Sequence, residues 1–98
     1  METKQYDVYI NTNKTNKVFY VGVSSDLVGR IWQHKNKFYP NSFSARYNVD
    51  KLVYYETYED VYEAIAREKQ LKAGSRQKKI DLVEKENPDY EDLSMDWF

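Results

Sequence analysis

Three polar side chains in one short stretch have the chemical types needed to act together on a phosphate group. Tyr20 lies in an apolar run over residues 18–23, and Arg30 and His34 follow shortly after it. Because Arg30 and His34 are four residues apart, a helix would place them one above the other on one face. A phenol, a guanidinium and an imidazole together offer a hydroxyl, a fixed cation and a proton acceptor. We therefore interpret residues 18–34 as the functional centre.

Glu68 is a second candidate, because it falls within the apolar stripe of a predicted helix. That stripe consists of Val61, Ala64, Ile65 and Leu71. A carboxylate seldom lies there unpaired, since burying its charge costs on the order of several kcal/mol. One interpretation is a hard divalent metal held by this carboxylate, water and a substrate phosphate, as Mg²⁺ prefers. An ion pair with Arg30, or a solvent-exposed helix edge, remains an alternative.

Two strands must position Tyr20. Residues 6–10 alternate in period two, and residues 18–23 form a second apolar run after a polar, Asn-rich loop over 11–17. The pair predicts a β-hairpin. If Asn11 lies opposite Val18, Tyr9 lies opposite Tyr20 and their rings are cross-strand neighbours. A register shifted by one residue would separate the rings, and the sequence alone leaves both open.

A helix from Asp26 to about Lys37 must position Arg30 and His34, with Ser25 as its predicted N-cap. Spacing at 100° per residue places Leu27, Ile31, His34 and Phe38 on one inward stripe. His34 would then face the interior or a cleft. Residues 39–42 break the helix, and residues 43–50 are expected to form an irregular connection.

The remaining elements follow from strand formers and helix caps. Residues 51–58 are rich in aromatic and apolar strand formers. Asp60 begins a capping-box pattern for a helix to about Lys72, and Gly74 ends that helix. Ser75 then caps a third helix that continues to about Glu86. Beyond it, the C-terminal tail either docks its aromatic rings or frays.

The elements follow the order β-β-α-β-α-α. This order predicts an α/β (α+β) fold with a small three-stranded, mostly antiparallel sheet flanked by three helices. At 98 residues the chain has the length of one domain, 1–98, with a core over about 6–86 and an acidic tail over 87–98. It has no cysteine, which excludes disulfides and thiolate metal sites. The start lacks an apolar signal core, and no apolar run approaches a membrane span, so we expect a cytoplasmic protein.

The formal net charge of −1 does not indicate a nucleic-acid-binding protein, but the charges are unevenly distributed. Residues 30–51 carry five basic residues against one acid, and residues 67–79 carry six against one. Residues 80–98 carry seven acids against one lysine. If the basic segments fold side by side, they form a face for a phosphate backbone. Its expected contacts are Lys35, Lys37, Arg46, Lys72 and Arg76. The alternative is solvated helix faces balanced by the acidic tail.

Taken in order, these motifs resemble the GIY-YIG endonuclease superfamily. The resemblance is carried by Asp-Val-Tyr ending at Tyr9, Tyr-Val-Gly beginning at Tyr20, Leu-x-x-Arg-x-x-x-His ending at His34, and the later Glu68. It covers residues 6 to about 86 and is strongest toward small single-domain bacterial members related to the nuclease domain of the DNA-repair excinuclease. One departure is Asp7, which stands where the family has glycine and adds a negative charge.

The resemblance implies a phosphodiester hydrolase that cuts DNA with one divalent metal, Mg²⁺ or Mn²⁺, in DNA repair or processing. It implies that Tyr20 helps to activate the attacking water or acts as a general base, and that Tyr9 positions the water or supports Tyr20. Arg30 would stabilise charge developing on the phosphate, and His34 would orient groups or assist proton transfer. Glu68 would be the sole protein ligand of the metal. The reference pKa of tyrosine is about 10, so a tyrosine base would need a nearby cation.

Three alternatives to an enzyme remain open on the sequence. The same fold could serve as a non-catalytic nucleic-acid-binding module with weak, salt-sensitive affinity. Tyrosines of the sheet could instead stack the bases of a single strand. A small α/β domain could also act only through protein contacts. For the enzyme, the expected partners are DNA, single-stranded or branched, and a protein that supplies targeting, with no membrane involved.

Overall fold

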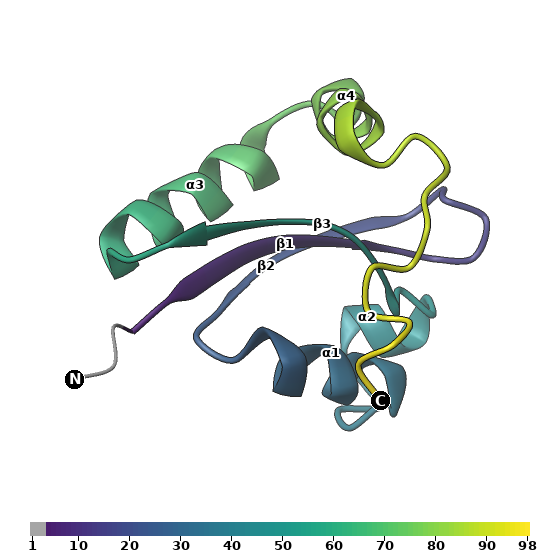
Figure 1. Cartoon of the computed structure of the whole chain (residues 1–98). Coiled ribbons are helices and arrows are strands. Elements are labelled where there is room, and N and C mark those ends of the chain that lie inside the picture. Colours follow the sequence, from purple (N-terminus) through teal and green to yellow (C-terminus); the bar gives the residue numbers. More distant parts are fainter. Residues whose placement is uncertain (1–3) are drawn as a thin grey trace.

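A three-stranded antiparallel sheet forms the centre of the protein (Figure 1). The computed structural model describes residues 4–98, so the first three residues of the predicted domain lie outside the described part. The strands are β1 (Tyr6–Thr12), β2 (Phe19–Ser24) and β3 (Lys51–Tyr58), in the spatial order β2-β1-β3. This confirms the predicted α+β class and the predominantly antiparallel sheet.

Helices cover both faces of this sheet (Figure 1). On one side lie α3 (Val61–Ala73) and α4 (Arg76–Glu86); on the other lie α1 (Leu27–Lys35) and α2 (Phe43–Arg46). The predicted connection over residues 43–50 therefore contains a fourth helix that the sequence pattern did not predict. The α2 helix is a single turn capped by the Ser42 hydroxyl, which accepts a hydrogen bond from Ala45 N. One turn is too short to produce a helical period in the sequence. No helix within residues 4–98 is long and apolar enough to cross a membrane.

Side chains of β1 alternate between two hydrophobic clusters, one on each face of the sheet. Val8 and Ile10 belong to the cluster under α3 and α4, which also includes Val21, Val53, Ala64, Leu71 and Val83. Tyr9 points the other way and packs with Leu27, Ile31 and Leu52 under α1. The central strand is therefore buried on both faces, and Tyr9 is only 1% exposed. Tyr9 therefore offers no face on which a base could stack, whereas Tyr55 of β3 is 42% exposed.

The hairpin register differs from the predicted one by two residues. Asn11 pairs with Tyr20, and Tyr9 pairs with Gly22, so the expected Tyr9–Tyr20 pair is wrong. The two rings nevertheless approach each other, with centroids 6.1 Å apart. The reason is Gly22: a Cβ atom there would lie 2.5 Å from Cζ and Oη of Tyr9. Because glycine has no side chain, the Tyr9 ring leans across β2 toward its diagonal neighbour.

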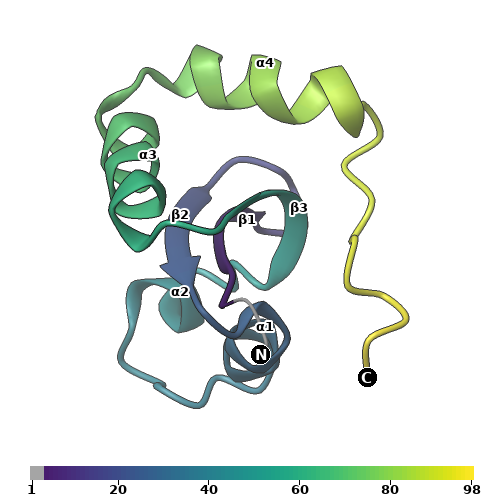
Figure 2. The same cartoon turned by 60° about the vertical axis from the view of Figure 1, so that its left-hand side comes forward.

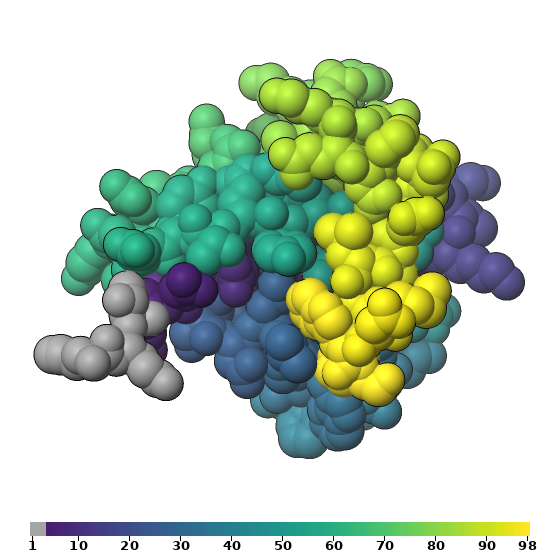
Figure 3. All heavy atoms as spheres, in the orientation of Figure 1, coloured from purple at the N-terminus to yellow at the C-terminus, as the bar shows by residue number. Residues whose placement is uncertain are grey.

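The C-terminal tail docks rather than frays. It runs along β3 toward α1 (Figure 3), and Leu93 N donates a 2.8 Å hydrogen bond to Leu52 O. Asp92 forms an ion pair with Lys35 of α1, and the Trp97 ring packs against Tyr55. The acidic tail therefore lies beside β3, at one edge of the sheet. Helix α3 lies toward β2, at the other edge (Figure 2).

Gly22→Ala is predicted to destabilise the fold. The added methyl overlaps a ring that is itself fully enclosed, so either the Tyr9 side chain or β2 must move. Overpacking of this kind typically costs about 1–3 kcal/mol. Urea denaturation followed by circular dichroism would measure the change. Gly74→Ala is the matched control: its Cβ would meet nothing closer than 3.4 Å, so the substitution should stabilise the fold by about 0.4–1 kcal/mol. Equal destabilisation by both substitutions would contradict this explanation of Gly22.

Candidate active site

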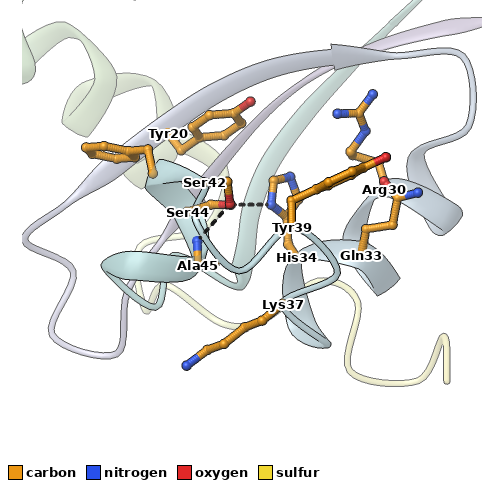
Figure 4. Close-up of a pocket in the computed structure, with 10 residues that line it drawn as sticks. Tyr20, Arg30, Gln33, His34, Lys37, Tyr39, Ser42, Ser44 and Ala45 are labelled. Atoms are coloured by element: carbon orange, nitrogen blue, oxygen red, sulfur yellow. Dashed lines mark hydrogen bonds between the residues drawn. The ribbon is translucent and has the colours of Figure 1, made fainter.

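A cavity of about 190 Å³ opens between β2, α1 and the loop that leads to α2 (Figure 4). Three of the predicted site residues, Tyr20, Arg30 and His34, line it, and so does the predicted DNA contact Lys37. In Figure 4, Tyr20 lies on the left of the view and Arg30 on the right, with His34 between them. The Tyr20 and His34 rings meet edge to face, with centroids 5.3 Å apart. The structure therefore brings together the side chains that the sequence predicts to converge.

Hydrogen bonds join the floor of this cavity to the core of the sheet. The Tyr9 hydroxyl lies 2.9 Å from Nε2 of His34, and Nδ1 of His34 lies 2.8 Å from the Ser44 hydroxyl. Both imidazole nitrogens are thus engaged. Because a neutral imidazole has one N–H and one acceptor nitrogen, one hydroxyl accepts a hydrogen bond from the ring while the other donates. This Tyr9–His34–Ser44 chain connects β1, α1 and α2.

Helix α1 aims Arg30 and His34 at the cavity because its opposite face is anchored in the core. Leu27 and Ile31 are buried against Tyr9, while Arg30 and His34 lie beside them at the cavity wall. The helix begins one residue later than predicted: Asp26, not Ser25, is the N-cap, and its carboxylate accepts a hydrogen bond from Gly29 N.

The end of α1 shapes the mouth of the cavity. The helix stops at Lys35 rather than at Lys37, and Lys37 adopts a left-handed backbone with φ of 50°. Phe38 N bonds to Gln33 O and Lys37 N bonds to His34 O, which together form a Schellman motif. The reversal turns Phe38 outward to 55% exposure, so its predicted place on the inward stripe is wrong. It also carries Lys37 and Tyr39 to the cavity wall.

The electrostatics of the site keep its two hydrogen-bonded rings neutral. Burial, reinforced by the positive charge of Arg30, lowers the pKa of His34 to about 4. Burial, followed by the neighbouring Tyr20, raises the pKa of Tyr9 well above its usual value, although Arg30 opposes this shift. At neutral pH the site therefore presents an uncharged imidazole, an uncharged phenol and the guanidinium of Arg30, an arrangement suited to an anionic ligand.

Glu68 approaches the site from α3 but does not line the cavity. Its side chain is 15% exposed and forms a 3.0 Å ion pair with Lys72, one helical turn away, instead of the considered pair with Arg30. The carboxylate lies near enough to Tyr9 to contribute to the raised pKa of that phenol. Within residues 4–98 no three or more His, Cys, Asp or Glu side chains gather in a way that could hold a metal. Glu68 thus influences the Tyr9 phenol without belonging, among residues 4–98, to a cluster of three or more possible metal ligands.

Comparison with known proteins decides the family. Residues 5–81 match the family model of the GIY-YIG catalytic domain. The chain belongs to the GIY-YIG family. Among solved structures, it is similar to the solution structure of the UPF0213 protein BH0048 from Bacillus halodurans, with 26% sequence identity and a TM-score of 0.57. That alignment covers 94% of this chain and 97% of the other. No curated protein matches the chain at a significant level.

The central polar residues of this GIY-YIG protein gather at one cavity, but the residues predicted to contact DNA are scattered over the structure. Lys37 lines the cavity and Arg46 is exposed at the end of α2. Lys35 is engaged by Asp92, and Lys72 by Glu68. Arg76 donates to Lys17 O in the β1–β2 loop, at the far end of the hairpin.

Two further residues take positions that the sequence does not predict. Ser44 bonds His34, yet no sequence pattern singles it out, because the contact depends on how the loop folds back. Its only local signal is Ser42 two residues earlier, a residue type typical of helix caps. Asp7, the departure from the family motif, accepts a 2.6 Å hydrogen bond from Thr57 and does not line the cavity.

The His34 environment predicts an unusual titration. His34 is the only histidine in the chain, so its ring resonances are unambiguous in an NMR pH titration. We expect a midpoint near pH 4 instead of about 6.5. Arg30→Gln should raise the midpoint part of the way, because it removes the repulsion but not the burial. The unfolded chain binds this proton below about pH 6.5 and the folded chain only near pH 4, so the group reduces stability as pH falls through that window. A midpoint near 6.5 would contradict the buried, doubly bonded arrangement.

Proposed function

We propose that this GIY-YIG protein is a divalent-metal-dependent endonuclease that hydrolyses DNA phosphodiester bonds, with residues about 6–86 as its nuclease domain. The observation that carries the proposal is the convergence of Tyr20, Arg30 and His34 on one cavity, with the His34 ring fixed by Tyr9 and Ser44. A phosphodiester needs a positioned water, cations near its oxygens and a nearby proton acceptor. Arg30 supplies one cation, and the tyrosines and His34 supply the polar groups that would position the water and accept a proton. The residues lining the cavity leave a second cation to be supplied.

Each polar residue takes a role that its environment allows. Arg30 binds the phosphate and stabilises the charge that develops on it, since its guanidinium is fixed and permanently charged. Tyr9 remains a neutral phenol, which suits it to hold His34 or a water molecule by hydrogen bonds rather than to remove a proton. Neutral His34, hydrogen-bonded at both nitrogens, orients these groups and can assist proton transfer along the Tyr9–His34–Ser44 chain. Tyr20 lies at the cavity wall, from which its hydroxyl would help to activate the attacking water.

The residues present fit a single hydrated Mg²⁺ or Mn²⁺ ion. Such ions bind through one or two carboxylates and retain several water molecules, so a lone Glu68 is a sufficient protein ligand. Its present partner, Lys72, is a half-exposed side chain that can move away when a cation arrives. When bound, the ion would supply positive charge at the phosphate oxygens and lower the pKa of a coordinated water.

A non-catalytic DNA-binding module with the same fold is the alternative. It would require the cavity but not the exact hydroxyl and imidazole groups. The presence of all five predicted residues, and the pairing of His34 at both nitrogens, supports the enzyme. A DNA-repair role, single-stranded or branched substrates, a targeting protein and a cytoplasmic location remain predictions from the sequence.

The test is a cleavage assay on supercoiled, single-stranded and branched DNA, with Mg²⁺ or Mn²⁺ against a chelator. We expect metal-dependent cutting by the natural protein. Arg30→Ala and His34→Ala should each lower the rate by about 10²–10⁴-fold. Glu68→Gln should abolish the metal response, while Glu63→Gln, an exposed carboxylate in the first turn of the same helix, should leave it unchanged. Binding of DNA without cutting by folded natural protein would favour the non-catalytic module.

Lys72→Ala is predicted to strengthen metal binding, because the lysine competes with the cation for the Glu68 carboxylate. Removing a half-exposed ion pair should tighten Mn²⁺ binding about 1.4- to 5-fold. The loss of free Mn²⁺ signal in electron paramagnetic resonance titrations reports binding directly, without DNA or turnover. Lys69→Ala, an exposed lysine next to Glu68 in sequence, is the matched control. Retained binding in Glu68→Gln would remove Glu68 as the ligand.

A further inference from the structure

Aromatic rings crowd the surface around the cavity. Five of them lie on the segment that runs from α1 through α2, and each is between 44% and 57% exposed. We name them the aromatic platform: Trp32, Phe38, Tyr39, Phe43 and Tyr47. Large apolar rings exposed singly are ordinary, but a group this dense beside a functional cavity marks a binding surface.

The platform consists of two groups, and each one reaches the cavity. Phe38 meets Tyr39 edge-on with ring centroids 4.9 Å apart, and Trp32 lies 6.3 Å from Phe38. In the second group, the Phe43 and Tyr47 ring centroids are 4.8 Å apart. Tyr39 and Phe43 both line the cavity, one contributed by each group.

Phe43 extends this second group into the site itself. Its ring is stacked on that of Tyr20, with an interplanar angle of 25° and centroids 6.5 Å apart. A run of neighbouring aromatic rings therefore continues from the exposed side of α2 to a residue that the proposed reaction uses.

The charge around the platform favours a polyanion. Residues 27–49 contain four basic residues and no aspartate or glutamate. Lys35 is paired with Asp92, whereas Arg30, Lys37 and Arg46 form no ion pair with any residue in the described range 4–98. The acidic tail lies beyond β3, away from the β2 edge (Figure 2). An apolar protein partner would not require unpaired cations interleaved with the rings.

We propose that the aromatic platform stacks unpaired bases on either side of a phosphate held in the cavity, so that the preferred substrate is single-stranded or locally unpaired nucleic acid. This inference rests on the proposed function for the cavity. In a duplex the bases stack on one another and offer only their edges, leaving exposed rings without a partner. Unpaired bases present their faces, and each base–aromatic stack is worth about 1–3 kcal/mol by alanine substitution.

The test measures binding in the presence of a chelator, so that no cutting interferes. Fluorescence anisotropy would compare a labelled single strand, the same sequence as a duplex, and a single strand whose bases are replaced by abasic sites. We expect the intact single strand to bind most tightly, because the abasic strand retains the phosphates but not the stacking surfaces.

Variants then assign that preference to the platform. Tyr39→Ala and Phe43→Ala should each weaken binding of the intact strand about 5- to 150-fold and hardly change binding of the abasic strand. Tyr39→Phe should restore binding, because it keeps the ring. Tyr62→Ala, which removes an 80% exposed ring on α3, is the control that should change nothing. Lys37→Ala should weaken intact and abasic strands alike.

The outcomes separate this inference from the proposed function. Equal affinity for single strand, duplex and abasic strand would overturn the stacking proposal even if the protein cuts DNA. A stronger effect of the platform variants on duplex than on single strand would also overturn it and indicate rings wedged between paired bases. Stacking-dependent binding without metal-dependent cutting would support the platform while removing the nuclease.

Discussion

The hydrogen bond between Tyr9 and His34 is the interaction on which the site depends. It joins a residue of the central strand, held on both sides by neighbouring strands, to α1, which is also attached through its apolar face and through Lys35. Through the second nitrogen of His34 it also fixes Ser44 and hence α2. The phenol can reach the imidazole only because Gly22 leaves room for its ring. The pairing of Tyr9 with Gly22 between β1 and β2 thus determines where the His34 side chain of α1 lies.

In this arrangement the permanent positive charge of Arg30 lies beside the neutral side chains of His34 and Tyr9. Burial works against charge on both His34 and Tyr9, and Arg30 further disfavours a second cation at His34. An anion entering the cavity would find a preorganised partner and would reverse the repulsion that keeps the imidazole neutral. Glu68, which contributes to the raised pKa of Tyr9, comes from the opposite helical layer and is already charge-compensated by Lys72. Arg30 and Glu68 therefore reach the surroundings of Tyr9 from different elements, α1 and α3.

Local sequence signals predicted most of the fold, and long-range pairing accounts for most of the errors. The strand over 51–58 and the caps at Asp60 and Ser75 were accessible because each depends on its own neighbours in the chain. The hairpin register was not, since sliding by two residues preserves the inward and outward pattern of both strands. The convergence of Arg30 and His34 followed from helical spacing. The bond to Ser44 did not, because it requires the loop after α1 to fold back on the helix.

The left-handed turn at Lys37 has a consequence for protein engineering. Most helices that end in this way have glycine at that position, since a side chain there costs about 1–2 kcal/mol. A procedure that optimises thermal stability alone would therefore select glycine at residue 37 and remove an amine from the rim of the cavity. The same backbone geometry that makes a side chain at residue 37 unfavourable also carries Tyr39 to the cavity wall. At residue 37, folding stability therefore favours glycine, whereas ligand binding favours lysine.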